Sequence, residues 1–177
     1  MDVLRTTGKT AEDDEESFAW FFTAEYPQVV RLLTVVVSDP AWAEDLAQEA
    51  FVRLHQRWSR VAEYESPEAW VRRVALNRAF SWRRREARRR EVEGQAPPWA
   101  TRPSMEAADS LVVLAAVRRL APRDRALVAL YHLEDRPMED VAAVLGLSRN
   151  ATKVALHRAR RRLAALLNDP IDEEVAR

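Results

Sequence analysis

The sequence predicts an all-α protein of two small helical domains joined by a flexible linker. Only 3 of the 177 residues are glycine, which is too few for a protein with many tight hairpins. Apolar residues recur at spacings of three and four along most of the chain, the period of a helix with one buried face. Between residues 91 and 108 this periodicity fades, and one glycine and three prolines interrupt any helix. A break of this kind favours two domains over one.

The same signals divide the chain into five segments. We expect an acidic disordered tail over residues 1–16, a first domain over 17–90, the linker over 91–108, a second domain over 109–167, and an acidic C-terminal tail over 168–177. The two tails are predicted from their lack of apolar periodicity and their excess of carboxylates. Each domain then has to build its own helical core.

Helix start signals order the first domain. A first helix is predicted over residues 17–37 from its apolar spacing. Asp39-Pro40 then supplies an N-cap residue followed by proline at the first helical position, where its missing N–H does no harm. Ser66-Pro67 repeats the signal and starts a third helix, which runs into an arginine-rich stretch. The first domain is therefore expected to be a small helical bundle.

The second domain contains the pattern of a helix-turn-helix. A short helix is predicted to begin at Pro137 and to end at Gly146, the residue that best tolerates a left-handed C-terminal position. Ser148 then caps a second helix. A short glycine-containing turn between two helices lets the second one enter the major groove of DNA.

The second helix of this motif has two different faces. One face, expected to seat it on the preceding helices, holds Thr152, Leu156, Ala159 and Leu163. The protruding side carries side chains suited to base edges, namely Asn150, Lys153, Val154 and His157. Cations suited to phosphates flank them: Arg149, Arg158, Arg161 and Arg162.

Charge along the chain also indicates a polyanionic partner. The net charge is zero, with 28 basic and 28 acidic residues, but the two signs are segregated. Residues 83–90 hold six arginines and one glutamate, and residues 149–162 hold five arginines, one lysine and no acid. Two separate basic blocks are the footprint expected when two surfaces contact one nucleic acid.

Several classes of protein are disfavoured by what the sequence lacks. Without cysteine there is no disulfide, Fe–S cluster or cysteine nucleophile, and the three histidines are too scattered to bind a metal. No glycine-rich phosphate loop or catalytic constellation accompanies the acids of residues 44–49, so we expect no enzyme activity and no cofactor. The longest apolar run, residues 32–37, is far too short for membrane insertion, and no secretory signal precedes it. A cytoplasmic protein is expected.

Two blocks of the sequence resemble the extracytoplasmic-function (ECF, group IV) sigma factors of bacterial RNA polymerase, in the sigma-70 family. The first block resembles sigma region 2 and reads AEDLAQEAFVRLHQRW (43–58) with SPEAWVRRVALNRAFSWRRREARRR (66–90). The second resembles sigma region 4 and reads LAPRDRALVALYHLEDRPMEDVAAVLGLSRNATKVALHRARRRL (120–163). Helix-turn-helix sequences are common, whereas the two blocks in tandem are specific to this family.

The resemblance implies a role for each block. It implies docking on the β′ clamp helices of core polymerase through Asp45, Gln48, Glu49 and Arg53. It implies minus-10 recognition of an unstacked DNA strand through Arg60, Tyr64, Asn77, Arg78, Trp82, Arg83 and Arg84. Region 4 would read the minus-35 duplex through Arg149, Asn150, Lys153, Val154, His157, Arg158 and Arg161. The implied partners are core RNA polymerase, including its β flap, promoter DNA and an anti-sigma factor.

One departure from the family pattern and two rival functions remain. Val154-Ala155 stands where the family commonly has Ser-Arg, which removes a hydroxyl and a cation from the side expected to face DNA. One rival function is a DNA-binding regulator that uses the same helix-turn-helix without docking on polymerase. The other is an interaction protein, such as a sigma-like decoy that binds polymerase or a regulator without opening promoters. Dependence of DNA binding on core polymerase separates the three.

Overall fold

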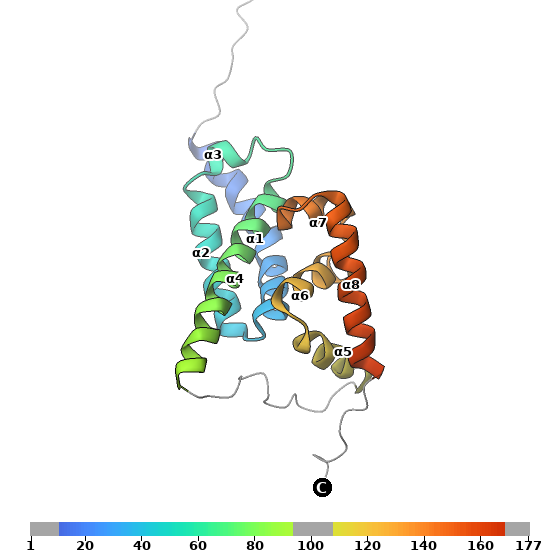
Figure 1. Cartoon of the computed structure of the whole chain (residues 1–177). Helices are drawn as coiled ribbons and strands as arrows, with labels where there is room; N and C mark the ends of the chain where they lie inside the picture. Colours follow the sequence, from blue (N-terminus) through green and yellow to red (C-terminus); the bar gives the residue numbers. More distant parts are fainter. Residues whose placement is uncertain (1–10, 94–107, 169–177) are drawn as a thin grey trace, which may run out of the picture.

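The computed structural model describes residues 11–93 and 108–168, and every regular element in these two stretches is helical (Figure 1). The first stretch contains α1 (Ala11–Val37), α2 (Pro40–His55), α3 (Trp58–Val61) and α4 (Pro67–Glu93). The second contains α5 (Ala108–Arg119), α6 (Pro122–Val128), the π-helical turn η2 (Ala129–Leu133), α7 (Met138–Leu145) and α8 (Arg149–Asn168). The all-α prediction is confirmed, while most of the expected linker and of the C-terminal tail lies outside the described residues.

The first helix begins earlier than the sequence indicated. α1 starts at Ala11, so residues 11–16, expected in the disordered tail, form its first turns. Three acids, Glu12, Asp13 and Asp14, occupy the first turn, where the positive end of the helix dipole stabilises carboxylates. A sequence that looks like an acidic tail is thus also a favourable helix start.

The starts of α2 and α4 follow the predicted capping signals. The side chain of Asp39 accepts a hydrogen bond from the backbone N–H of Trp42 at 3.2 Å, with proline at the first position of α2. The hydroxyl of Ser66 accepts one from the N–H of Ala69 at 3.2 Å at the start of α4. Each bond satisfies a donor that the helix itself leaves free.

The first half, residues 11–93, is a bundle of α1, α2 and α4 with α3 across one end (Figure 1). Its core is aliphatic in the middle and aromatic near α3, where Phe18 and Phe21 pack on the ring of Trp58. The indole N–H of Trp58 donates to the hydroxyl of Ser17 at 2.8 Å. The short α3 is thereby fixed to the N-terminal part of α1.

The second half, residues 108–168, packs α5 and α6 against the long α8. Val117, Leu120, Val128 and Ala159 form a small buried cluster there. The α-helix α6 ends at Val128, and the chain continues directly into the π-helical turn η2. This turn places the residues that follow it against the first half.

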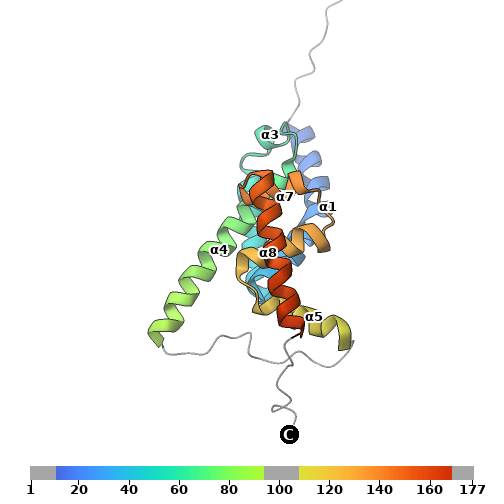
Figure 2. The ribbon, with the colours of Figure 1, turned by 45° about the vertical axis from the view of Figure 1, so that its right-hand side comes forward.

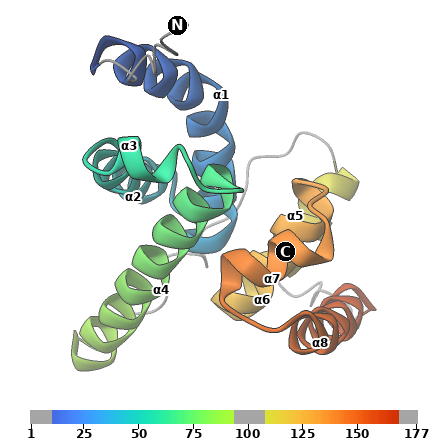
Figure 3. The same ribbon diagram turned by 90° about the horizontal axis from the view of Figure 1, so that it is seen from above.

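The two halves share one core. Buried residues of α1, α2 and α4 form a single cluster with Leu127, Leu130, Val141, Val144 and Leu156 of the second half. Contacts run from α1 to α6 and from α4 to α7, and in the view of Figure 3 the second half lies alongside α1 and α4. The sequence did not indicate this packing. Even so, both arginine-rich stretches keep exposed side chains, including Arg84, Arg85, Arg88, Arg158 and Arg161.

Candidate nucleic-acid interface

The turn between α7 and α8 has the backbone of a helix-turn-helix. Gly146 ends α7 with φ 67°, in the left-handed region, as predicted. This conformation favours glycine, and a Cβ at this position would lie 3.2 Å from Nη2 of the Arg73 side chain. The hydroxyl of Ser148 then accepts from the N–H of Ala151 at 3.2 Å and caps the start of α8.

The two faces of α8 are divided as expected. Thr152, Leu156 and Ala159 are buried against the preceding helices. Every residue proposed to contact the minus-35 duplex has an exposed side chain: Arg149, Asn150, Lys153, Val154, His157, Arg158 and Arg161. The candidate DNA-reading face is therefore exposed to solvent over residues 149–161 of α8, the helix that lies in front in the view of Figure 2.

Some of the cations on α8 already have protein partners. Arg149 Nε lies 2.5 Å from Glu139 Oε1, and Arg162 Nη1 lies 2.5 Å from Asp124 Oδ2. Arg160 donates to Nε2 of His132 at 3.0 Å, and its guanidinium lies 5.0 Å from the ring centroid of Tyr131. Burial, with the Arg160 charge, lowers the pKa of His132, which favours the neutral imidazole that accepts this bond. Arg162, expected to contact phosphate, is thus held by Asp124.

The proposed minus-10 residues on α4 differ in exposure. Asn77 and Arg84 are exposed. Arg83 is half-buried, and its Nη1 donates to the carbonyl of Val37 at 3.4 Å. Only part of this set is free to meet an unstacked strand.

Trp82 does not provide the exposed stacking surface that the sequence suggested. Its side chain is only 8% exposed, because the ring of Trp42 in α2 packs on it at a centroid distance of 5.0 Å. Trp42 itself is 43% exposed. Trp42 was not among the predicted site residues, although its position three residues before Asp45, off the buried stripe of α2, is a signal in the sequence. The exposed aromatic ring of this pair is therefore that of Trp42.

The proposed polymerase-docking residues and minus-10 residues meet in one groove. Asp45, Gln48, Glu49 and Arg53 are exposed on α2 and line a hollow together with Arg78 of α4. Arg78 Nη2 forms an ion pair with Glu49 Oε2, which joins the two sets directly. A second hollow between the same helices also has Trp42 in its lining and adds Asn77, Trp82 and Arg85.

Arg60 and Tyr64 lie elsewhere in the first half. Both are exposed, Arg60 in α3 and Tyr64 in the segment before α4. They are at the end of the bundle where α4 begins, whereas Arg83 lies 16 residues further along α4, or about 24 Å at 1.5 Å per residue (Figure 1). The structure therefore does not bring Arg60 and Tyr64 together with Arg83 and Arg84.

Arg83 and Arg84 instead face the second half. With Phe80 they line a hollow between α4 and the start of α6, closed on the other side by Pro122 and Arg123. The Arg123 guanidinium lies 5.7 Å from the ring centroid of Phe80. Side chains from both halves of the chain thus line the hollow that contains Arg83 and Arg84.

No three His, Cys, Asp or Glu side chains of the described stretches gather into a group that could hold a metal ion. None of the helices in residues 11–93 and 108–168 has the length and apolar character that crossing a bilayer demands.

Comparison with known proteins identifies both halves. Family models match Sigma-70 region 2 over residues 21–89 and Sigma-70, region 4 over residues 110–163. The chain is 36% identical over 129 residues to the RNA polymerase sigma-E factor of Streptomyces antibioticus, covering 72% of each chain. This chain belongs to the sigma-70 family. The resemblance of its two sequence blocks to sigma regions 2 and 4 is thereby confirmed.

Other relatives place the sigma factor in the ECF group. It is 31% identical over 126 residues to the ECF RNA polymerase sigma factor SigF of Caulobacter vibrioides, with 71% of this chain and 70% of that one covered. The solved sigma factor RpoE of Bartonella quintana, in complex with the anti-sigma factor NepR, has the same fold with a TM-score of 0.73. That match covers 88% of this sigma factor and 99% of RpoE at 22% identity.

Proposed function

We propose that this alternative sigma factor reads a promoter with two separate surfaces while a third binds core RNA polymerase. As a sigma-70 family member it directs RNA polymerase to specific promoters. The exposed face of α8 is proposed to read the minus-35 duplex. The groove between α2 and α4 is proposed to receive the unstacked minus-10 strand, with Trp42 as its aromatic surface. Sigma factors are non-catalytic initiation factors, and we propose no reaction and no cofactor for this chain.

One observation carries the minus-35 part of this proposal. Along α8, three side chains are buried against the domain while all seven proposed DNA contacts are exposed. Such a division leaves the helix rigidly seated and its reading face free to enter a major groove. Base-edge donors and acceptors occupy the centre of that face at Lys153 and His157, and arginines flank them.

The proposed partners follow the exposed surfaces. The acids and amide of α2 suit a basic partner helix, and we propose the β′ clamp helices for this surface and the β flap for region 4. The sigma factor RpoE, whose solved structure has a similar fold, is bound there to the anti-sigma factor NepR, and we propose such an inhibitor among the partners of this chain. We propose a cytoplasmic location, where the chain would act with RNA polymerase.

Reconstituted transcription tests the function. The purified chain is mixed with core RNA polymerase and promoter DNA, and transcript start sites are mapped with and without it. Specific starts that need both the chain and the core enzyme support the proposal. Tight duplex binding without core would instead identify a DNA-binding regulator, and core binding without promoter opening would identify a decoy.

Lys153→Ala is expected to change which minus-35 sequences are used. Loss of one base contact costs about 1–3 kcal/mol at the base pair that Lys153 reads and little elsewhere. The measurement is transcription from a promoter library randomised in the minus-35 element. Equal loss on all sequences would contradict a base-reading role.

Arg161→Ala serves as the matched change at a proposed phosphate contact on the same helix. It is expected to reduce the slope of log affinity against log salt by about 0.9 and to leave sequence preference unchanged. The slope is measured by titrating promoter binding of the holoenzyme at several salt concentrations. An unchanged slope would mean that Arg161 faces solvent in the complex.

A further inference from the structure

The hollow between α4 and the start of α6 has the size and the apolar lining of a small-molecule site. Its volume is about 720 Å³, within the range of about 300–1,000 Å³ that is usual for such sites. Its apolar lining comes from α4 and from the start of α6, and consists of Phe80, Ala87, Ala121 and Pro122. Ala87 and Ala121 are exposed, so a ligand can reach this space from solvent. We call it the α4–α6 hollow.

The polar side of the α4–α6 hollow is strongly cationic. Three arginines line it, namely Arg83, Arg84 and Arg123. The carboxylate of Glu86 lines it as well, but both of its oxygens already accept hydrogen bonds from Arg89, at 2.9 and 3.1 Å. Because positive charge dominates this lining, the hollow attracts anions and repels cations.

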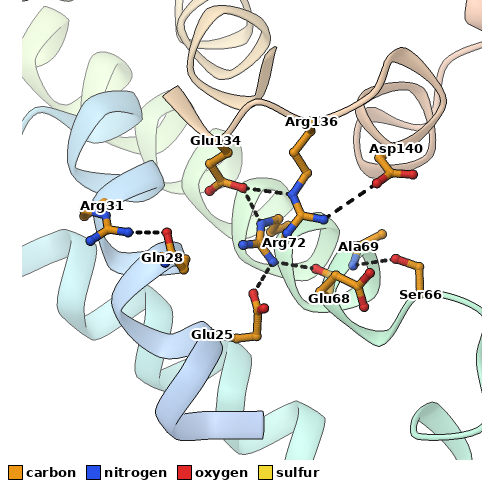
Figure 4. Close-up of polar contacts among 10 residues, drawn as sticks. All are labelled: Glu25, Gln28, Arg31, Ser66, Glu68, Ala69, Arg72, Glu134, Arg136 and Asp140. Atoms are coloured by element: carbon orange, nitrogen blue, oxygen red, sulfur yellow. Dashed lines mark hydrogen bonds and ion pairs between the residues drawn. The ribbon is translucent and has the colours of Figure 1, made fainter. Parts of the chain in front are cut away.

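The arginines of the hollow differ in their partners from the buried arginine near the start of α4. Arg72 has carboxylate oxygens of Glu25 and Glu134 at 2.6 Å each, so its charge is compensated within the protein (Figure 4). In the described part of the chain, by contrast, no ion pair with a carboxylate includes Arg84 or Arg123. These two guanidinium groups can therefore take a carboxylate from a ligand.

The contacts of Arg84 and Arg123 place charge beside apolar surface. Nη2 of Arg84 donates to the hydroxyl of Ser81 at 3.3 Å, which directs the guanidinium along α4. The guanidinium of Arg123 lies 5.7 Å from the ring centroid of Phe80. Cationic and aromatic parts of the lining are thus neighbours, an arrangement that suits a ligand with one charged and one apolar group.

The positive potential beside the hollow also acts on a buried neighbour. Arg125 of α6 is 2% exposed, and burial, followed by the charges of Arg83 and Arg118, lowers its pKa to about 10. Arg83 is one of the arginines that line the α4–α6 hollow. An anion bound there would offset part of this repulsion between cations.

We propose that the α4–α6 hollow binds a small amphipathic carboxylate. The carboxylate group accepts charge-assisted hydrogen bonds from Arg84 and Arg123. The alkyl chain packs on Phe80 and Pro122 and leaves water. A neutral molecule with the same chain loses the first contribution, and a small anion without a chain loses the second, so the site selects ligands that have both groups.

Calorimetric titration of the free full-length chain with octanoate tests the site. The comparison ligands are 1-octanol, octylammonium and hexanoate. We expect octanoate to bind about tenfold or more tightly than 1-octanol, which lacks the bonds to a charged group, and than octylammonium, which the arginines repel. Hexanoate is expected to bind about tenfold more weakly, since each buried methylene contributes about a factor of four. Equal binding of octanoate and octylammonium would overturn the proposal.

Arg123→Gln and Arg85→Gln are the matched pair of charge variants. Both arginines are exposed, and each variant loses one positive charge, but Arg85 is not among the residues that line the α4–α6 hollow. We expect Arg123→Gln to weaken octanoate binding about tenfold or more and Arg85→Gln to change it less than about twofold. Equal weakening by both would reveal only an effect of net charge and would overturn the site.

Ala87→Trp fills the hollow, and Ala165→Trp on α8 is its control. Both alanines are exposed, and Ala165 lies outside the lining of the hollow. Circular dichroism and thermal melting establish that both variants are folded. We expect Ala87→Trp to abolish octanoate binding and Ala165→Trp to leave it unchanged. Octanoate binding that survives Ala87→Trp would overturn the placement of the ligand.

Arg84 belongs both to the hollow and to the proposed minus-10 residues, so a bound carboxylate competes with DNA for it. This competition rests on the proposed function, whereas ligand binding by the free chain does not. We expect saturating octanoate to weaken promoter binding by the wild-type holoenzyme about threefold or more, and to leave that of the Ala87→Trp holoenzyme unchanged. Promoter affinity that ignores octanoate would overturn the competition. If octanoate binds the free chain while the chain supports no promoter-specific transcription, the ligand site stands and the proposed function fails.

Discussion

Asp45→Arg is expected to lower the affinity of the sigma factor for core RNA polymerase more than about 100-fold. Placing a cation against a basic partner helix costs several kcal/mol, and each 1.4 kcal/mol is a factor of ten. The side chain of Asp45 is exposed on α2, so the fold is expected to survive the change. The measurement is binding of labelled protein to core polymerase at fixed salt.

Glu44→Arg provides the control for this charge reversal. Glu44 is also exposed on α2 but is not among the residues that line the α2–α4 hollows. Glu44→Arg changes the net charge by the same amount as Asp45→Arg, so any long-range electrostatic effect appears in both variants. Equal weakening by both variants would remove Asp45 from the docking surface and leave only an effect of net charge.

Leu54→Ala is expected to lower the free energy of unfolding by about 2–5 kcal/mol, the usual cost of a cavity in a well-packed core. Leu54 is 0% exposed in the core shared by α1, α2 and α4. Urea denaturation followed by circular dichroism measures the change.

Val52→Ala, two residues earlier on the same helix, is the matched control. Val52 is 56% exposed, and its truncation is expected to change stability by less than about 0.5 kcal/mol. A similar loss in both variants would contradict the packing of α2 described above. Because Val52 lines the hollow with the docking residues, the same variant also reports whether apolar contact contributes to polymerase binding.

Local signals predicted much of the fold. Asp39-Pro40, Ser66, Gly146 and Ser148 mark helix ends in the structure as they did in the sequence. Capping works through bonds within three or four residues, so sequence alone contains the needed information. The seated and exposed faces of α8 were predictable for the same reason, since a helical period relates them.

Features that depend on contacts between distant segments were not predictable. Arg72 and Arg73 are neighbours of the same type, yet one is buried between regions and the other is exposed. The burial of Trp82 depends on Trp42, forty residues away in sequence. The π-helical turn η2 is followed directly by Glu134, which accepts a hydrogen bond from Arg72, 62 residues away in sequence, and no local signal contains that contact.

The end of α1 has a consequence for synthesis on the ribosome. The carbonyl of Val36 and the hydroxyl of Ser38 receive their hydrogen bonds from Arg125, which lies 89 residues after Val36. At bacterial and eukaryotic elongation rates of about 5–20 residues per second, roughly 4 to 18 s pass between the emergence of these two positions. During that interval the two acceptors at the end of α1 are present in the nascent chain without the arginine that donates to them.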